Sequence, residues 1–134
     1  MDILSSDPRS LTASNLVDLT IISSDITFSY LSEMVSYISK LRDDSPIFLN
    51  KKRFDLILAR YASMRRCVEG TVEFARDPKN RTYASLEAMY AGDDASQSVD
   101  LAKELRGGLP QEMVRRGGRL MDLATLLFLL TDKW

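Results

Sequence analysis

The segment from Leu120 to Leu130 constrains the fold of this chain more than any other stretch, because nine of its eleven residues are apolar. Apolar residues on every side predict an element that other elements surround. As a helix the segment would rise roughly 16 Å, about half of the ~30 Å hydrocarbon layer that a membrane span crosses. A buried strand is the alternative, but the segment lacks Val and Ile and is rich in Leu, which favours a helix. We therefore expect a buried C-terminal helix at the centre of the fold.

The length and composition are those of one globular domain. The chain has 134 residues, of which 45% are hydrophobic and 28% charged, and this is enough to bury a core without disulfides. Its net charge of −1 hides an asymmetry between two parts of the chain. Residues 1–47 contain seven acids and three bases, whereas residues 48–134 contain fifteen bases and twelve acids. These opposite charges are expected to attract each other within one fold or across a dimer.

The single cysteine, Cys67, rules out an internal disulfide and favours a reducing compartment. The first residues, Met1 to Pro8, lack the basic start and the apolar core of a signal peptide. We therefore expect a cytoplasmic or nuclear protein, a class that includes viral proteins made in either place. Cys67 itself is expected to be a partly buried thiol. A lowered pKa is the alternative if the flanking arginines face it.

The beginning of the chain predicts an arm followed by the folded domain. Residues 1–13 are mostly polar and contain Pro8, so we expect a flexible N-terminal arm there. The bundle domain is expected to occupy residues 14–134. Residues 15–22 contain several β-branched side chains and fit either a short helix or a strand.

Two long helices are expected next. Apolar residues recur at helical steps over 24–42, and Ser23 or Ser24 is the expected N-cap of this helix. A second helix is expected over 50–77, with Asn50 as its N-cap. These two helices are expected to form long walls of a bundle.

Glycines divide the second half of the chain into shorter expected elements. Gly92 is expected to stop one helix, Gly107-Gly108 to close the next, and Gly117-Gly118 to cap a short helix before the leucine-rich one. The expected helices lie at 82–91, 94–106, 110–116 and 119–131. The sequence therefore predicts an all-α, single-domain bundle of about five helices around a buried C-terminal helix.

The absence of histidine limits the chemistry that this chain can perform. It removes the commonest general base near neutral pH and the commonest ligand of transition metals. One cysteine cannot build a structural zinc site, and no glycine pair is followed by the Lys-Ser/Thr of a phosphate-binding loop. Carboxylate pairs on helices, such as Glu69 and Glu73, are interpreted as solvated faces because helical metal sites also use histidine. We expect no catalysis, no metal site and no cofactor.

Basic residues are the remaining candidates for a binding site. They form three groups: along the helix at 50–77, in the turn after it, and before the last helix. If the fold brings these groups onto one surface, they could hold a phosphate backbone or an acidic partner without reading bases. The candidate contacts are Lys51, Lys52, Arg53, Arg60, Arg65, Arg66, Arg76, Lys79, Arg81, Arg115, Arg116 and Arg119.

The leading functional hypothesis is a non-catalytic protein-protein interaction or assembly module that forms a homo-oligomer and contacts other proteins. Its basis is the charge complementarity described above and more apolar helical surface than one small core absorbs. The alternative is a small helical nucleic-acid-coating protein, such as a nucleoprotein or coat subunit, that binds the phosphate backbone through the arginines. The aromatic residues behind the first hypothesis are Tyr30, Tyr37, Tyr61, Tyr83, Tyr90, Phe128 and Trp134.

Overall fold

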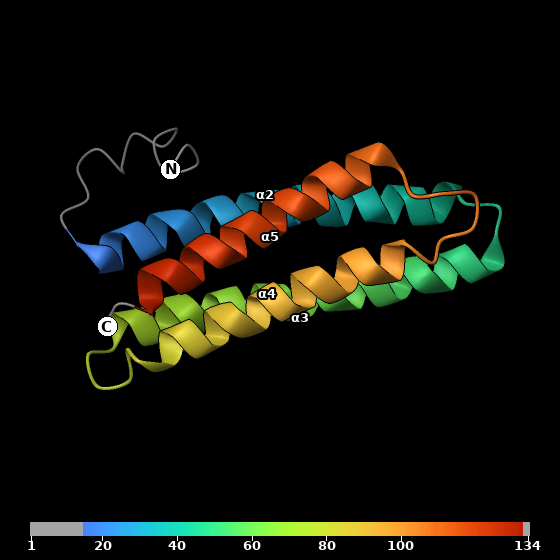
Figure 1. The fold of residues 1–134 in the computed structure, drawn as a ribbon. Coiled ribbons are helices and arrows are strands. Elements are labelled where there is room, and N and C mark those ends of the chain that lie inside the picture. Colours follow the sequence, from blue (N-terminus) through green and yellow to red (C-terminus); the bar gives the residue numbers. More distant parts are fainter. Residues whose placement is uncertain (1–14, 133–134) are drawn as a thin grey trace.

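The described part of the chain, residues 15–132, forms four antiparallel α-helices in the computed structural model (Figure 1). They are α2 (Leu16–Asp44), α3 (Phe48–Arg76), α4 (Tyr83–Ala102) and α5 (Gln111–Thr131). Each helix packs against the next one along the chain, and α5 closes the ring against α2. Figure 1 shows two layers, α2 beside α5 and α3 beside α4. The all-α class is confirmed, and the expected count of about five helices is corrected to four over the described residues.

Helix α2 begins earlier than expected. Asn15 is its N-cap, and the Asn15 side chain accepts a hydrogen bond from the backbone N–H of Asp18 at 2.9 Å. Residues 16–22 are therefore helical and form no strand. Ser23 and Ser24, the expected N-cap, are buried inside this helix. The Ser23 hydroxyl donates a 2.8 Å hydrogen bond to the backbone carbonyl four residues earlier. This bond satisfies the hydroxyl inside the helix, so Ser23 does not act as an N-cap.

Helix α3 begins at Phe48, two residues before the expected cap. Asn50 lies inside the helix and is only 6% exposed. Its side-chain amide donates a hydrogen bond to the backbone carbonyl of Arg106 and accepts one from the Arg106 N–H, both at 2.9 Å. Asn50 thus ties the start of α3 to the α4–α5 loop and does not cap the helix.

Helix α4 continues through the expected break at Gly92. One glycine costs a helix about 1 kcal/mol relative to alanine, and the buried side chains on both sides of Gly92 offset this cost. Asp94, which was expected to open a new helix, is buried and lies 3.7 Å from the guanidinium of Arg60. The two expected helices at 82–91 and 94–106 are therefore one helix, which ends at Ala102 and is not closed by Gly107-Gly108 as expected.

Helix α5 runs without a break through Gly117-Gly118, so the expected cap and the separate helix at 110–116 are wrong. Gly117 is buried, and a Cβ added there would lie 3.1 Å from Cγ2 of Val99 on α4. Close approach of two helices explains this glycine. The other pair, Gly107-Gly108, has φ of 89° and 98° in the α4–α5 loop, which is the left-handed conformation that glycine allows.

Helix α5 lies in the ring of four helices and not at its centre. It contacts α4 and α2, and it leaves Leu129 55% exposed and Met121 36% exposed. Residues 119–131 are helical, as expected, but the expectation that other helices surround them is wrong. The core draws instead on all four helices. Its largest fully buried side chains include Leu31, Met34 and Ile38 of α2, Ile57, Tyr61 and Met64 of α3, and Leu120, Leu123 and Leu127 of α5.

Some expectations fall on other parts of the chain. The arm expected at 1–13 and the aromatic residue Trp134 lie outside the described residues. Among the described helices, none is both long and apolar enough to cross a membrane. The remaining aromatic residues divide into three classes: Tyr61 is buried, Tyr30, Tyr37 and Phe128 are half-buried, and Tyr83 and Tyr90 are exposed.

Candidate interaction surfaces

The inner face of α4 is built from small residues. Ala84, Ala88, Ala91 and Ala95 recur at steps of four, three and four, so they share one side of the helix. All four are at most 1% exposed. Small side chains let helix axes approach closely. Helix α4 therefore packs tightly against α3 and α5 while contributing little large-residue volume to the core.

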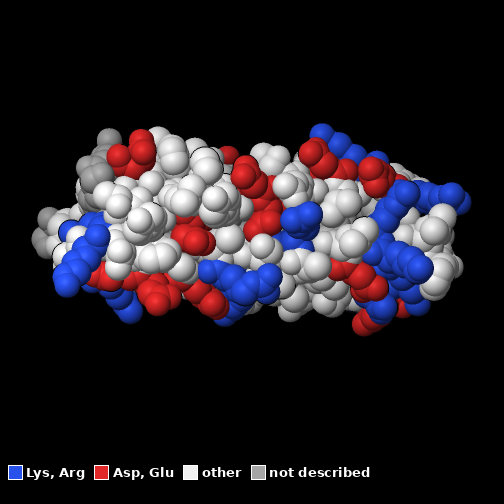
Figure 2. Space-filling model, turned by 90° about the horizontal axis from the view of Figure 1, so that it is seen from below, with Lys and Arg blue, Asp and Glu red and all other residues white. Residues whose placement is uncertain are grey.

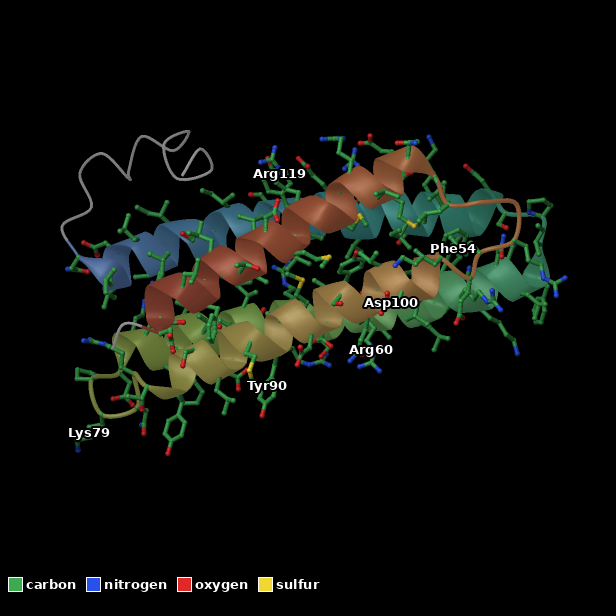
Figure 3. The ribbon with its side chains drawn as sticks, viewed as in Figure 1. Phe54, Arg60, Lys79, Tyr90, Asp100 and Arg119 are labelled. Carbon is green, nitrogen blue, oxygen red and sulfur yellow. The ribbon has the colours of Figure 1, made fainter. Side chains whose placement is uncertain are left out.

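The large apolar side chains of α4 point outward instead. Tyr83, Leu86, Met89 and Tyr90 are 53%, 40%, 44% and 45% exposed. Figure 3 shows Tyr90 pointing away from the bundle, below the α3 and α4 layer. Tyr83 also contacts Phe74 of α3, with ring centroids 5.6 Å apart. These residues leave roughly 300–400 Å² of apolar surface exposed, comparable with the largest patches on monomeric proteins.

We call Tyr83, Leu86, Met89 and Tyr90 the α4 face. The sequence pattern predicts a helix over these residues but does not predict that their side chains face solvent. The alanine stripe on the opposite side of the same helix was the sequence feature that could have predicted this orientation. A helix that buries its alanines turns its larger side chains to solvent.

Charged residues flank the α4 face along the helix axis. Arg76 and Lys79 lie before it, at the end of α3 and in the α3–α4 turn, and both are exposed. Asp93 and Asp100 lie after it on α4 and are also exposed. Asp100 is 3.6 Å from the ammonium group of Lys103. The surface is thus basic on one side of the apolar residues and acidic on the other.

The twelve basic candidates from the sequence are spread over the molecule. Lys51 and Arg76 lie near opposite ends of α3, and 25 helical steps separate them by roughly 38 Å. Arg115, Arg116 and Arg119 belong to α5, in the other layer of the bundle. Figure 2 shows basic and acidic groups interspersed along the face seen from below. The structure therefore does not bring the three groups into one continuous basic surface, and a nucleic-acid coat remains an untested prediction.

Several of these bases already have partners within the fold. Arg60 lies 3.7 Å from Asp94, and Arg65 lies 3.5 Å from Glu69. The guanidinium of Arg81 donates a hydrogen bond to the backbone carbonyl at residue 75, at the end of α3. The two carboxylates offset the charge of Arg60 and Arg65, and the hydrogen bond holds the Arg81 side chain against the end of α3.

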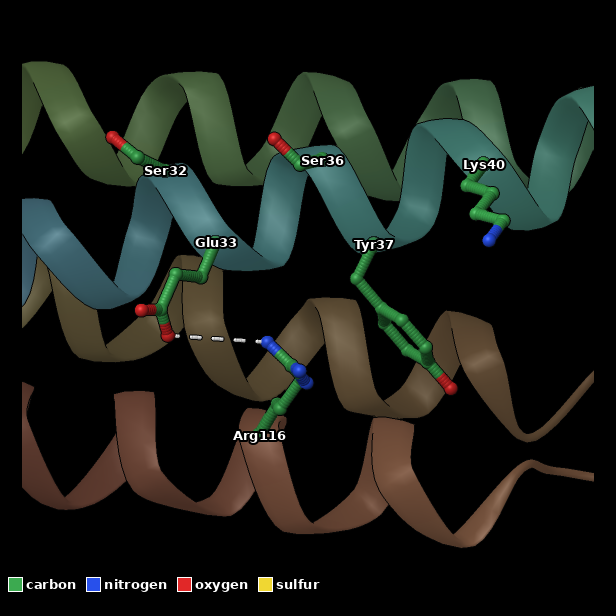
Figure 4. A pocket seen from close by; sticks show the side chains of 6 residues that line it. All are labelled: Ser32, Glu33, Ser36, Tyr37, Lys40 and Arg116. Atoms are coloured by element: carbon green, nitrogen blue, oxygen red, sulfur yellow. Dashed lines mark ion pairs between the residues drawn. The ribbon is translucent and has the colours of Figure 1, made fainter.

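A shallow groove of about 600 Å³ lies between α2 and α5 (Figure 4). Arg116 crosses it, 3.9 Å from Glu33 and with its guanidinium carbon 5.0 Å from the ring centroid of Tyr37. Its Nε also donates a 2.8 Å hydrogen bond to Glu112. Burial and the negative charge of Glu112 raise the pKa of Tyr37 despite the nearby arginine. The Glu33–Arg116 pair joins the two oppositely charged parts of the chain within one fold, so this groove is interpreted as part of the helix packing.

Cys67 is half-buried and faces acids. Its Sγ lies 3.8 Å from Oδ2 of Asp94. Burial and the negative charges of Asp94 and Glu87 raise the pKa of the thiol to about 11. The expected partly buried thiol is what the structure shows. The alternative of a lowered pKa is wrong, because burial and acids, and no arginine, cause the shift. In residues 15–132, no three Cys, Asp or Glu side chains gather into a metal-binding group.

The comparisons with known proteins give one kind of match. No protein-family model and no curated protein matches the sequence. The structure is similar to the crystal structure of a pectin methylesterase inhibitor from Arabidopsis thaliana, with a TM-score of 0.79. The match covers 90% of this chain and 79% of that chain, at 16% sequence identity. This likeness shows a shared helical-bundle fold.

Proposed function

We propose that this chain is a non-catalytic protein-interaction module and that it self-associates through the α4 face. The observation that carries the proposal is the orientation of α4, which buries alanines and exposes Tyr83, Leu86, Met89 and Tyr90. An exposed apolar patch of this size is often an interaction site. Covering them removes apolar area from solvent and stabilises an assembly.

The size of the α4 face fits the centre of an interface. A standard protein-protein interface covers about 800 Å² on each partner, with an apolar core and a polar rim. The four apolar residues supply about half of that area, and the charged residues beside them supply the rim. Tyrosine is also a residue that commonly contributes strongly to binding.

The charges beside the α4 face favour a second copy as the partner. A two-fold dimer requires that residue i contacts residue j of the partner and that j contacts i. If two α4 helices pack antiparallel with Leu86 near the two-fold axis, the basic turn containing Lys79 lies near Asp93 of the partner. Two-fold symmetry makes this contact occur twice, once on each side of the axis, and it is attractive each time. A parallel arrangement would bring like charges together.

The structural neighbour is consistent with a protein-binding role. That protein is an inhibitor of pectin methylesterase, so it acts on another protein. The same fold can present a helix face to a partner without any catalytic group. The identity of 16% transfers neither the target nor the contact residues to this chain.

Sedimentation equilibrium over a range of protein concentrations tests the proposal. The natural chain is expected to change from monomer to dimer as its concentration rises, and Leu86→Ser with Tyr90→Ser is expected to remain monomeric. The matched control is Leu56→Ser with Leu129→Ser, which removes two exposed leucines from α3 and α5 and should leave the dimer intact. A monomer at all concentrations, or equal weakening by both pairs, contradicts the proposal.

A charge exchange tests the antiparallel arrangement. Lys79→Asp and Asp93→Lys should each weaken the dimer, because each places like charges opposite one another at both ends. The double variant should recover association, because both contacts become attractive again. Additive weakening in the double variant would exclude this arrangement.

A further inference from the structure

The start of α3 exposes the most solvent-accessible large apolar side chain in the described residues, Phe48, at 68%. Leu49 beside it is 42% exposed. Figure 1 shows that the α2–α3 turn and the α4–α5 loop lie at this same end of the bundle, where no helix covers them. The two exposed side chains thus belong to a segment at one end of the bundle.

Three consecutive bases, Lys51, Lys52 and Arg53, follow these apolar residues. We call Phe48, Leu49 and these three bases the α3 tip. Over the described residues, none of the three bases forms an ion pair with an acid. The ammonium group of Lys52 lies 5.2 Å from the ring centroid of Phe48, so charge and apolar surface are adjacent. Figure 2 shows basic side chains around uncharged surface at the right-hand end, where α3 begins.

The helix end itself adds positive potential. Helix α3 has no side-chain N-cap and no acidic residue in its first turn. The backbone N–H groups of a first turn carry a partial positive charge, and cations placed there are unfavourable unless an anion approaches. The sequence of the α3 tip is therefore electrostatically unfavourable within the isolated chain and favourable beside a negatively charged surface.

Neighbouring contacts hold the α3 tip in place. The two hydrogen bonds between Asn50 and Arg106 connect it to the α4–α5 loop. Arg106 adds a fourth base, which is exposed like Lys52, whereas Lys51 and Arg53 are half-buried. Asp55 is paired with Arg42, so its charge is already compensated. Asp43 and Asp44 remain exposed at the end of α2, and they reduce the positive potential of this end.

We propose that the α3 tip binds the surface of anionic membranes. Phe48 and Leu49 enter the boundary between headgroups and acyl chains, while Lys51, Lys52 and Arg53 contact lipid phosphates and carboxylates. An apolar protrusion surrounded by bases matches the two layers of such a surface. A nucleic-acid backbone fits less well, because Leu49 has no ring on which a base could stack and Asp43 and Asp44 lie at the same end of the bundle.

Vesicle co-sedimentation tests this proposal. The chain is expected to bind phosphatidylcholine vesicles that contain about 30% phosphatidylserine, to lose binding as salt is added, and not to bind phosphatidylcholine alone. Lys51→Gln with Lys52→Gln should weaken binding roughly 30-fold, from the typical contribution of a base near an anionic membrane. Phe48→Ala with Leu49→Ala should weaken it roughly tenfold, because less apolar area is buried.

Matched variants at the other end of α3 and in α4 provide controls. Arg76→Gln with Lys79→Gln removes the same charge, and Tyr83→Ala with Leu86→Ala removes exposed apolar area; neither pair should change vesicle binding. Asp43→Asn with Asp44→Asn should strengthen it. Absence of binding to anionic vesicles at low salt overturns the proposal, and so does binding that is unaffected by the Phe48 and Leu49 changes. Tighter binding to single-stranded RNA that displaces vesicles would assign the α3 tip to nucleic acid instead.

Discussion

A leucine placed on the inner face of α4 should destabilise the fold strongly. Ala91 is 0% exposed and lies in the main core cluster, where α4 packs against both α3 and α5. Ala91→Leu adds three carbon atoms to a site without space for them. Overpacking of this kind costs about 1–3 kcal/mol. For a domain of this size, a loss of about 2 kcal/mol lowers the melting temperature by roughly 6–12 °C.

The outward side of the same helix should respond differently. Leu86→Ala removes a side chain that is 40% exposed and exchanges two good helix formers, so the free energy of unfolding should fall by less than about 1 kcal/mol. Ala59→Leu, at an exposed position of α3, is the control for the added leucine and should be close to neutral. Urea and thermal unfolding should be measured at low protein concentration, where the chain is monomeric. A neutral Ala91→Leu together with a strongly destabilising Leu86→Ala would show that α4 faces the opposite way.

Three further predictions concern stability. Gly118→Ala should stabilise α5 by about 0.5–1 kcal/mol, because nothing lies within 4 Å of a Cβ added there. Gly117→Ala should stabilise it less, because the added Cβ would lie 3.1 Å from a valine of α4. Urea unfolding of the two variants compares them directly. Hydrogen bonds from Arg115 and Arg116 lower the pKa of Glu112 from 4.5 to about 2. The stabilising contribution of the Glu112 carboxylate is therefore complete above pH 4.5 and is lost as the pH falls toward 2. The natural chain should lose stability over this pH range faster than the Glu112→Gln variant. Asn50→Ala should cost about 1–3 kcal/mol, and faster amide exchange at Arg106 would show that the loop is released.

The helical class was predictable because apolar residues recur at steps of three and four through most of the chain. The ends of the helices were less predictable. Ser23 and Ser24 have the chemistry of an N-cap, but a serine hydroxyl can also donate to a carbonyl one turn earlier, as Ser23 does. Sequence reasoning alone cannot choose between these two hydrogen bonds, because the choice depends on whether the preceding residues are already helical.

The glycines show a second limit of the sequence. A glycine can end a helix or can let two helices approach closely, and the sequence does not distinguish these two roles. Gly107 takes a positive φ and lies in a loop, whereas Gly117 lies inside α5 against Val99. Only the packing of α4 against α5 separates the two cases. The expected number of helices was too high because Gly92 and Gly117 were both interpreted as ends.

The sequence predicted which residues form the candidate surfaces, but it did not predict where on the molecule those residues lie. The sequence identified Lys51, Lys52 and Arg53 as candidate contacts for a phosphate backbone or an acidic partner, and the structure places them beside Phe48 at one end of the bundle. It also assigned Tyr83 and Tyr90 to a helix with apolar surface to spare. Tyr83 and Tyr90 face solvent because the alanine side of α4 packs more closely against α3 and α5 than the tyrosine side would. That difference depends on how the helices pack and is not visible in the sequence of α4 alone.

Disulfide trapping at the α4 face tests the central claim most directly, that two copies meet through the outer side of this helix. Leu86→Cys should be prepared in a Cys67→Ser background, with Leu129→Cys in the same background as the control. Mild oxidation is predicted to link Leu86→Cys into a covalent dimer rapidly and Leu129→Cys slowly, because only position 86 approaches its own copy across a two-fold axis. Equal rates of cross-linking at the two positions would contradict the account.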